Sequence, residues 1–222
     1  MFSLGAAIAG ATRAGAHIEV LTVMAADPAS ETPAGPWDDR SWFLSEGHAA
    51  RLRRKEDAAA CAILGAKPQW LPYGDEQYDR HGGEKEIHSA VSAIVAGADS
   101  VLIPGFPLAN PDHAWLSELL IRRGLPCGRL GLYVEQPYTF TRRWVPDTTV
   151  MTPLQPLLKP PVGWTSLPTE EADRRAKFTA MRAYRSQLRQ LSMSNIALRR
   201  LLRYEVACQG EAIAWLTDVN RH

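Results

Sequence analysis

The sequence predicts an α/β fold, a Rossmann-like three-layer sandwich around a mostly parallel sheet, with a helical extension at its C-terminus. Helical and strand patterns alternate over the first two thirds of the chain. The predicted strands are short runs rich in β-branched residues, which are typical of buried parallel strands. From about residue 170 the pattern changes to two long helices. We therefore expect a domain over residues 1–168 and an extension over 169–222 packed on it.

The first predicted helix and strand lie at the N-terminus. Leu4, Ile8 and Ala11 recur at helical spacing over residues 3–14. The run at 18–24, Ile-Glu-Val-Leu-Thr-Val-Met, suits a buried strand. A doubly wound sheet normally enters its first helix from a central strand. We therefore expect the first strand of the fold to be missing from this chain.

A long loop follows over residues 25–44, which are rich in Pro, Asp, Gly and Ser. Its aromatic run at 37–43 has two open interpretations: a lid over a sugar, or a segment packed onto the edge of the sheet. The apolar spacing then predicts a helix over 45–64 that ends at Gly65. A short strand ends at 70–72.

The remaining elements of the domain are two helices and two strands. A helix over residues 84–96 ends at Gly97. A strand at 99–103 leads through a short loop into a helix over 111–123, and the next strand covers 130–134. This order continues the alternation that a parallel sheet requires.

The extension is predicted as two helices, over 170–191 and 194–217, with Ser194 as a helix cap. Both are rich in arginine. Two interpretations of this charge are open: a site for an acidic partner, such as a nucleotide-linked sugar or nucleic acid, or a solvated helical face.

Composition excludes several classes of protein. A net charge of +1 gives no overall footprint for nucleic acid, and no apolar run is long enough for a membrane span. Met1–Ala16 lacks the positive start of a signal peptide, so we expect an internal helix there. No Gly-x-Gly-x-x-Gly or Walker motif supports a nucleotide-binding domain. The chain has only three, widely spaced cysteines, which predicts reduced thiols and a cytoplasmic protein.

One segment carries a clear chemical pattern. Asn110 is a good helix cap, Pro111 suits the first helical position, and Asp112 complements the helix dipole. His113 then lies in the first turn, at the carboxyl end of a strand, where α/β sheets bind ligands. The positive helix end favours neutral imidazole, which can bind a metal. A catalytic zinc needs about three protein ligands, so the alternative is a capped helix with a surface histidine.

Several segments, in order along almost the whole chain, resemble the PIG-L/LmbE family of zinc-dependent N-acetylglucosamine deacetylases. Phe2–Ala9 resembles the family's Ser-Leu-Gly-Gly-like helix start, Val20–Val23 its Val-x-Val-Leu-Thr strand, and Arg53–Glu56 its Arg-x-x-Glu helix. Leu64–Ala66 resembles the Leu-Gly end of that helix, Leu71–Asp75 the Leu-Pro-x-x-Asp segment, and Asn110–His113 the His-Pro-Asp-His motif. Tyr133–Tyr138 resembles the Tyr-Glu-Asp-x-Pro-Tyr strand end, and Lys177–Gln187 the Lys-x-x-Ala-x-x-x-Tyr-x-Ser-Gln helix.

The resemblance implies removal of an acetyl group from a small-molecule N-acetyl amino sugar or its conjugate, with zinc as cofactor. It implies that His113 is a metal ligand and that Asn110 faces the oxyanion, where the family has a histidine. Asp112 would orient its neighbours. The implied substrate-binding residues are Asp75, Arg80 and Glu135. For the first two, a solvated loop is the alternative.

The family's first motif, His-Pro-Asp-Asp, supplies two metal ligands and the catalytic aspartate, and it lies just before residues equivalent to Phe2. We therefore expect a chain shortened at its N-terminus with impaired activity. The alternative is a non-catalytic sugar-binding or structural remnant of the same fold. A homo-oligomer is left open.

Overall fold

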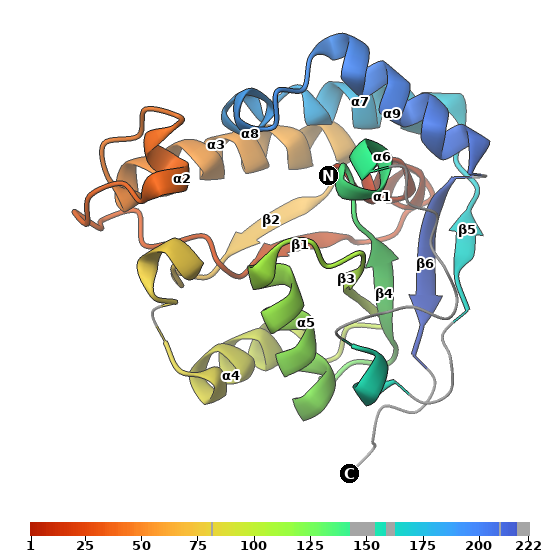
Figure 1. Ribbon diagram of the computed structural model, residues 1–222. Helices are drawn as coiled ribbons and strands as arrows, with labels where there is room; N and C mark the ends of the chain where they lie inside the picture. The colour runs from red at the N-terminus through yellow and green to blue at the C-terminus, as the bar shows by residue number, and fades with distance from the viewer. Residues whose placement is uncertain (81, 143–153, 159–162, 209, 217–222) are drawn as a thin grey trace. The chain divides into compact units, whose positions relative to one another are not determined.

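The computed structural model describes residues 1–222 with the exception of 81, 143–153, 159–162, 209 and 217–222. The chain forms two compact units. The first unit consists of residues 1–82 and 169–206, and the second of 83–168 and 207–222. Each unit is therefore built from two separate stretches of sequence (Figure 1).

The first unit combines a two-stranded parallel sheet with helices from both stretches (Figure 1). The strands pair from Glu19 opposite Lys67 to Thr22 opposite Trp70. Its elements are α1 (Gly5–Arg13), β1 (Glu19–Thr22), α2 (Pro36–Asp39), α3 (Glu46–Leu64), β2 (Lys67–Trp70), the 3-10 helix η1 (Glu76–Tyr78), α7 (Glu171–Met181), α8 (Arg185–Gln190) and α9 (Asn195–Ala207).

Helix α3 has the ends that its sequence specifies. The Ser45 hydroxyl accepts a hydrogen bond from the His48 amide at 3.1 Å, which caps the first turn. Gly65 ends the helix in the left-handed conformation, with φ +72°. These local signals explain why the predicted helix over 45–64 is confirmed.

The helices α1, α3 and α7 pack through small buried side chains. Ala9, Ala60 and Ala180 form a core cluster with Leu64. At Gly5, an added Cβ would lie 2.8 Å from Cγ of the buried Lys177. Helix α1 therefore approaches α7 closely because it presents glycine and alanine there.

The second unit contains a four-stranded sheet in the order β3-β4-β6-β5. Strands β3 and β4 are parallel, and β6 is antiparallel to β4 and to β5. Its elements are α4 (Glu84–Val95), β3 (Val101–Phe106), α5 (Pro111–Arg123), β4 (Leu130–Val134), α6 (Tyr138–Arg142), the 3-10 helix η2 (Gln155–Leu157), β5 (Thr165–Leu167) and β6 (Glu211–Trp215).

The predicted α/β class is confirmed, and both sheets include parallel strands. Two predictions for the C-terminal helices are wrong. The helix expected over 170–191 breaks between Met181 and Arg185, and the helix expected over 194–217 ends at Ala207. Positions 209 and 217 of that expected helix lie outside the described residues.

The second correction has a physical reason. After α9 the chain turns at Gly210, which has φ +118° and lies so close to the Leu167 carbonyl that a Cβ would stand 2.1 Å from its oxygen. Glycine alone fits this turn, and β6 then pairs between β4 and β5.

The domain boundary at residue 168 stays a prediction. Within the described part of the chain, no helix is both long and apolar enough to cross a membrane.

Candidate active site

The start of α5 holds its polar residues by helix capping. The Asn110 side-chain oxygen accepts a hydrogen bond from the Asp112 amide at 2.8 Å, and Pro111 occupies the first turn. The buried Ser117 hydroxyl donates to the Pro104 carbonyl at 2.7 Å, which ties the helix to β3. These bonds fix the first turn of α5, and with it the position of His113, beside the end of β3.

Glu135 lies directly after β4 and is 1% exposed. One of its carboxylate oxygens contacts Nδ1 of His113. The other accepts a hydrogen bond from the Leu108 amide at 2.6 Å. The carboxylate is therefore anchored on both sides, and it holds an imidazole whose side chain is 39% exposed.

This contact sets the chemistry of the imidazole. When a carboxylate accepts a hydrogen bond from Nδ1–H, the lone pair of the neutral ring lies on Nε2. Metal-binding histidines usually hold their second ring nitrogen against a carboxylate or carbonyl in this way. His113 and Glu135 thus fit the arrangement of one metal ligand and its supporting residue.

Tyr138, at the start of α6, lies beside His113 and was not among the site residues predicted from the sequence. Its ring centroid lies 6.5 Å from that of His113 at an interplanar angle of 75°. Burial raises the pKa of Tyr138, although a hydrogen bond with the Asn110 side chain acts in the opposite direction. The phenol is therefore protonated at neutral pH. The sequence signal that could have identified Tyr138 was its position at the end of the segment Tyr133–Tyr138, which resembles the family's strand-end motif.

The structure brings Asn110, Asp112, His113 and Glu135 together in the second unit. The two other predicted site residues belong to the first unit. Asp75 precedes η1, and its carboxylate accepts a hydrogen bond from the side-chain Nε2 of Gln77 at 2.9 Å. The Arg80 guanidinium lies 4.0 Å from the Glu76 carboxylate. Their predicted contacts with substrate stay predictions, as does that of Glu135.

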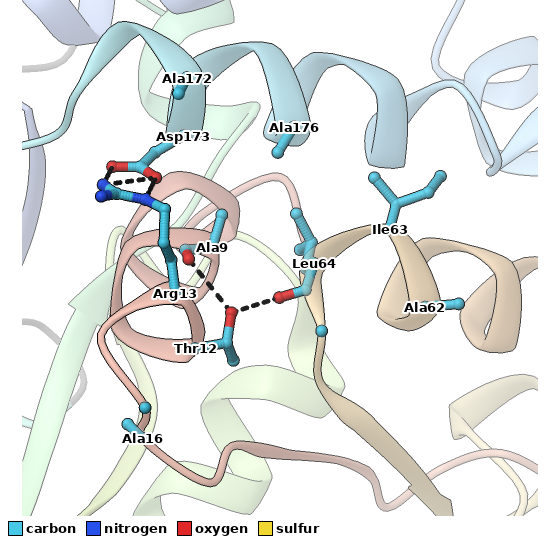
Figure 2. A pocket seen from close by; sticks show the side chains of 12 residues that line it. Ala9, Thr12, Arg13, Ala16, Ala62, Ile63, Leu64, Ala172, Asp173 and Ala176 are labelled. Carbon is cyan, nitrogen blue, oxygen red and sulfur yellow. Dashed lines mark hydrogen bonds and ion pairs between the residues drawn. The ribbon is translucent and has the colours of Figure 1, made fainter.

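A pocket of about 510 Å³ in the first unit has a different character (Figure 2). Small apolar side chains of α1, α3 and α7 line much of it. Its polar side chains bind one another or the backbone: Thr12 donates to the Leu64 carbonyl at 2.6 Å, and Arg13 pairs with Asp173 at 3.1 Å. These groups stabilise the packing of the three helices.

Among the described residues, no group of three or more histidine, cysteine, aspartate or glutamate side chains is arranged to hold a metal ion. Within that part of the chain, His113 with its support from Glu135 fits the role of one ligand.

Comparison with known proteins identifies the family. Residues 1–123 match the model of the family PIG-L, described as GlcNAc-PI de-N-acetylase. The chain belongs to the PIG-L family. Its sequence matches no curated protein.

Solved structures of deacetylases share the fold of this PIG-L chain. The A40926 pseudoaglycone deacetylase Dbv21 is 25% identical with a TM-score of 0.74, over 97% of this chain and 90% of that one. The zinc-inhibited form of teicoplanin deacetylase Orf2 is 21% identical with a TM-score of 0.73, over 97% and 93%. The N,N'-diacetylchitobiose deacetylase from Pyrococcus horikoshii is 19% identical with a TM-score of 0.52, over 96% and 78%.

The family description and the Dbv21 neighbour point to a deacetylase of amino-sugar conjugates.

Proposed function

We propose that this protein is a metal-dependent hydrolase that removes the acetyl group from an N-acetyl amino sugar carried on a larger conjugate. The contact of buried Glu135 with His113 Nδ1 carries the proposal, because it leaves Nε2 as the ring nitrogen that can bind a ligand. The 25% identity with a deacetylase of a glycopeptide pseudoaglycone favours a conjugate over a free sugar. A cytoplasmic location is part of the proposal, supported by three free cysteines.

Zinc, where bound, polarises the amide carbonyl and activates a water molecule. The residues of this chain would contribute binding and positioning. His113 would supply one ligand, held in a single orientation by Glu135. Asn110 and the protonated phenol of Tyr138 would donate hydrogen bonds to the developing oxyanion. Asp112, next to His113 in the first turn, would help to orient that ligand.

The Asn110 side chain has two functions in this scheme. Its oxygen caps α5 through the Asp112 amide, so its amide nitrogen is the group that can donate. Asparagine carries no charge and transfers no proton at this position. We therefore expect Asn110 to stabilise the oxyanion without acting as an acid.

The decisive experiment measures zinc and acetate together. Zinc per chain is determined by metal analysis of the purified protein and by titration, for the parent, His113→Ala and the control His17→Ala. His17 is exposed and pairs only with Glu19 on the surface in the described structure. Acetate release is assayed with an N-acetylglucosamine conjugate. We expect zinc binding that is lost in His113→Ala alone, accompanied by acetate release that is slow because activity is impaired.

Two other outcomes are informative. Zinc binding that His113→Ala leaves unchanged would contradict the proposed ligand. Zinc and sugar binding without acetate release would support the alternative, a non-catalytic sugar-binding protein of the same fold. The same assay tests the sequence-based prediction that activity is impaired in this chain.

A further inference from the structure

Positive charge is concentrated in one segment of the first unit. Between residues 182 and 203 the sequence has arginines but no aspartate or glutamate, whereas the whole chain has a net charge of only +1. All of these arginines are exposed. We call them the arginine face: Arg182, Arg185, Arg189, Arg199, Arg200 and Arg203.

The arginine face lacks the carboxylate partners that several other arginines have. Arg13 pairs with Asp173, Arg122 with Glu84 and Arg175 with Glu171. In the part of the chain that the structure describes, no member of the arginine face forms such an ion pair. Its positive charge is therefore not neutralised by the protein itself.

Contacts and helical spacing within the first unit connect pairs of these arginines. The guanidinium groups of Arg182 and Arg199 lie 5.8 Å and 4.9 Å from the Phe178 ring centroid, which joins the end of α7 to α9. Spacings of four residues place Arg185 with Arg189 on α8, and Arg199 with Arg203 on α9. The helices α7, α8 and α9 lie on the same side of α3 (Figure 1).

Exposed apolar side chains border the charge. Trp42 is 73% exposed, and its ring centroid lies 4.8 Å from the Arg189 guanidinium. Leu44, two residues further on, is 82% exposed, and Ile196 at the start of α9 is 64% exposed. Exposed apolar side chains therefore accompany the unneutralised arginines, with Trp42 in contact with Arg189 and with Ile196 three and four positions before Arg199 and Arg200 on α9.

We infer that the arginine face, with Trp42, Leu44 and Ile196, binds the surface of a bilayer that contains anionic lipid. Arginines within reach of anionic headgroups strengthen binding by about fivefold each. Trp42 and Leu44 extend from a loop and can enter the interfacial region, where tryptophan is favoured. A polynucleotide would use the arginines and could stack on Trp42, but it offers no apolar environment for Leu44 and Ile196. This inference does not depend on the proposed deacetylase activity.

The test is co-sedimentation of the full chain with vesicles of phosphatidylcholine alone, or of phosphatidylcholine with phosphatidylglycerol. We expect binding only to the second kind, weakened by salt. Arg199→Glu/Arg200→Glu/Arg203→Glu should reduce it by at least about 100-fold, and Arg203→Glu alone by about tenfold or more. The matched control is Lys85→Glu, which replaces a positive by a negative charge, as Arg203→Glu does, at an exposed position on α4.

A second variant separates the apolar contribution. Trp42→Ser/Leu44→Ser should reduce vesicle binding at high salt while leaving the salt dependence unchanged, and circular dichroism would verify folding of each variant. Absence of binding to anionic vesicles, or equal loss in Lys85→Glu and Arg203→Glu, would overturn the inference. Tighter binding to a single-stranded oligonucleotide, with the same arginine dependence, would overturn it in favour of nucleic acid.

Discussion

Glu135 determines what His113 can do. The carboxylate is buried, it follows the last residue of β4, and it is anchored by the Leu108 amide. An imidazole on an exposed helix turn would otherwise rotate and exchange tautomers freely. The contact with Glu135 therefore fixes Nε2 of His113 as the one ring nitrogen that can bind a metal, before any ligand is present.

Removal of the Glu135 carboxylate tests this arrangement. In Glu135→Ala the buried Leu108 amide loses its acceptor, which should cost about 1–3 kcal/mol of unfolding free energy. Loss of a carboxylate that supports a metal-binding histidine reduces metal affinity by about 10- to 100-fold. Glu135→Gln retains one acceptor oxygen and should be intermediate in both. Denaturant unfolding and zinc titration measure the two effects, and zinc affinity unchanged in Glu135→Ala would contradict the supporting role.

Cys61 should be chemically inert in the folded protein. Burial raises its pKa to about 11, so the thiol is neutral at pH 8 and the reactive thiolate is scarce. Cys208 is exposed. Timed alkylation at pH 8 with mass spectrometry should therefore label Cys208 quickly and Cys61 only after unfolding. Because the folded pKa is raised above the ordinary value, this group stabilises the fold below about pH 9 and loses that contribution as pH rises toward 11. Rapid labelling of native Cys61 would contradict the burial.

At the scale of elements, the sequence predicted best where local signals are strong. Helix α5 and strand β4 have their predicted bounds, since Asn110 and Pro111 begin the helix and the strand is a short apolar run. The break between α7 and α8 has no glycine or proline to mark it, so tertiary contacts decide it. One such contact is Glu56, which accepts hydrogen bonds from the Ser186 amide and hydroxyl at 2.9 Å and 2.6 Å.

Strand β6 was missed although a signal was present. Gly210 interrupts the helical pattern, and the five residues after it form a short, partly apolar run. Because the apolar residues before and after Gly210 also fit a helical spacing, the sequence was interpreted as one continuous helix. In the site, His113, Asn110 and Asp112 could be proposed from one segment, but the partner of His113 could not, because Glu135 is 22 residues away and only the sheet brings it close.

Strand β3 depends on a glycine. A Cβ at Gly105 would lie 2.5 Å from Cβ of Leu132 on the neighbouring strand and 3.1 Å from the Trp164 ring. Because a backbone-fixed Cβ cannot move aside, Gly105→Ala should lower the unfolding free energy by about 1–3 kcal/mol. At Gly83 an added Cβ meets no atom within 4 Å, so Gly83→Ala is the control and should change stability by less than about 1 kcal/mol. Equal effects in a denaturant titration would contradict the close packing of β3 on β4.

The buried pair of Lys177 and Glu205 joins α7 to α9, with Nζ 2.6 Å from the carboxylate oxygen. Neither side chain has appreciable exposure. Lys177→Met should therefore cost about 3–5 kcal/mol, since it leaves Glu205 as a buried charge without its ammonium. The double change Lys177→Met/Glu205→Leu should recover much of this loss. A double-mutant cycle by chemical denaturation checks the coupling, and additive losses would show that the pair contributes little.

At the scale of the whole molecule, each unit is built from two separate stretches of the chain, and the second unit takes its last stretch from the C-terminus. Strand β6 comes from the last residues and lies between β4 and β5, so the sheet of the second unit is incomplete without the C-terminus. A chain that stops after Val206 should expose the edge of β4 and lose the four-stranded sheet, with aggregation as the result. A chain that stops after Leu216 keeps β6 and is the control. Solubility and circular dichroism compare them, and a soluble folded chain ending at Val206 would instead support a separable domain over 1–168.

The division of each unit into two stretches also affects how the protein is made. The helix α1 leaves the ribosome early, yet the α7 side chains that cover Gly5 and pair with Arg13 are translated only after the whole stretch 83–168. Asp173 follows Arg13 by 160 residues, so at about 5–20 residues per second the delay is on the order of 8 to 32 s. During this time the alanine-rich surfaces of α1 and α3 lack the α7 side chains that complete their core cluster. The nascent chain therefore exposes apolar helical surface until α7 has been made.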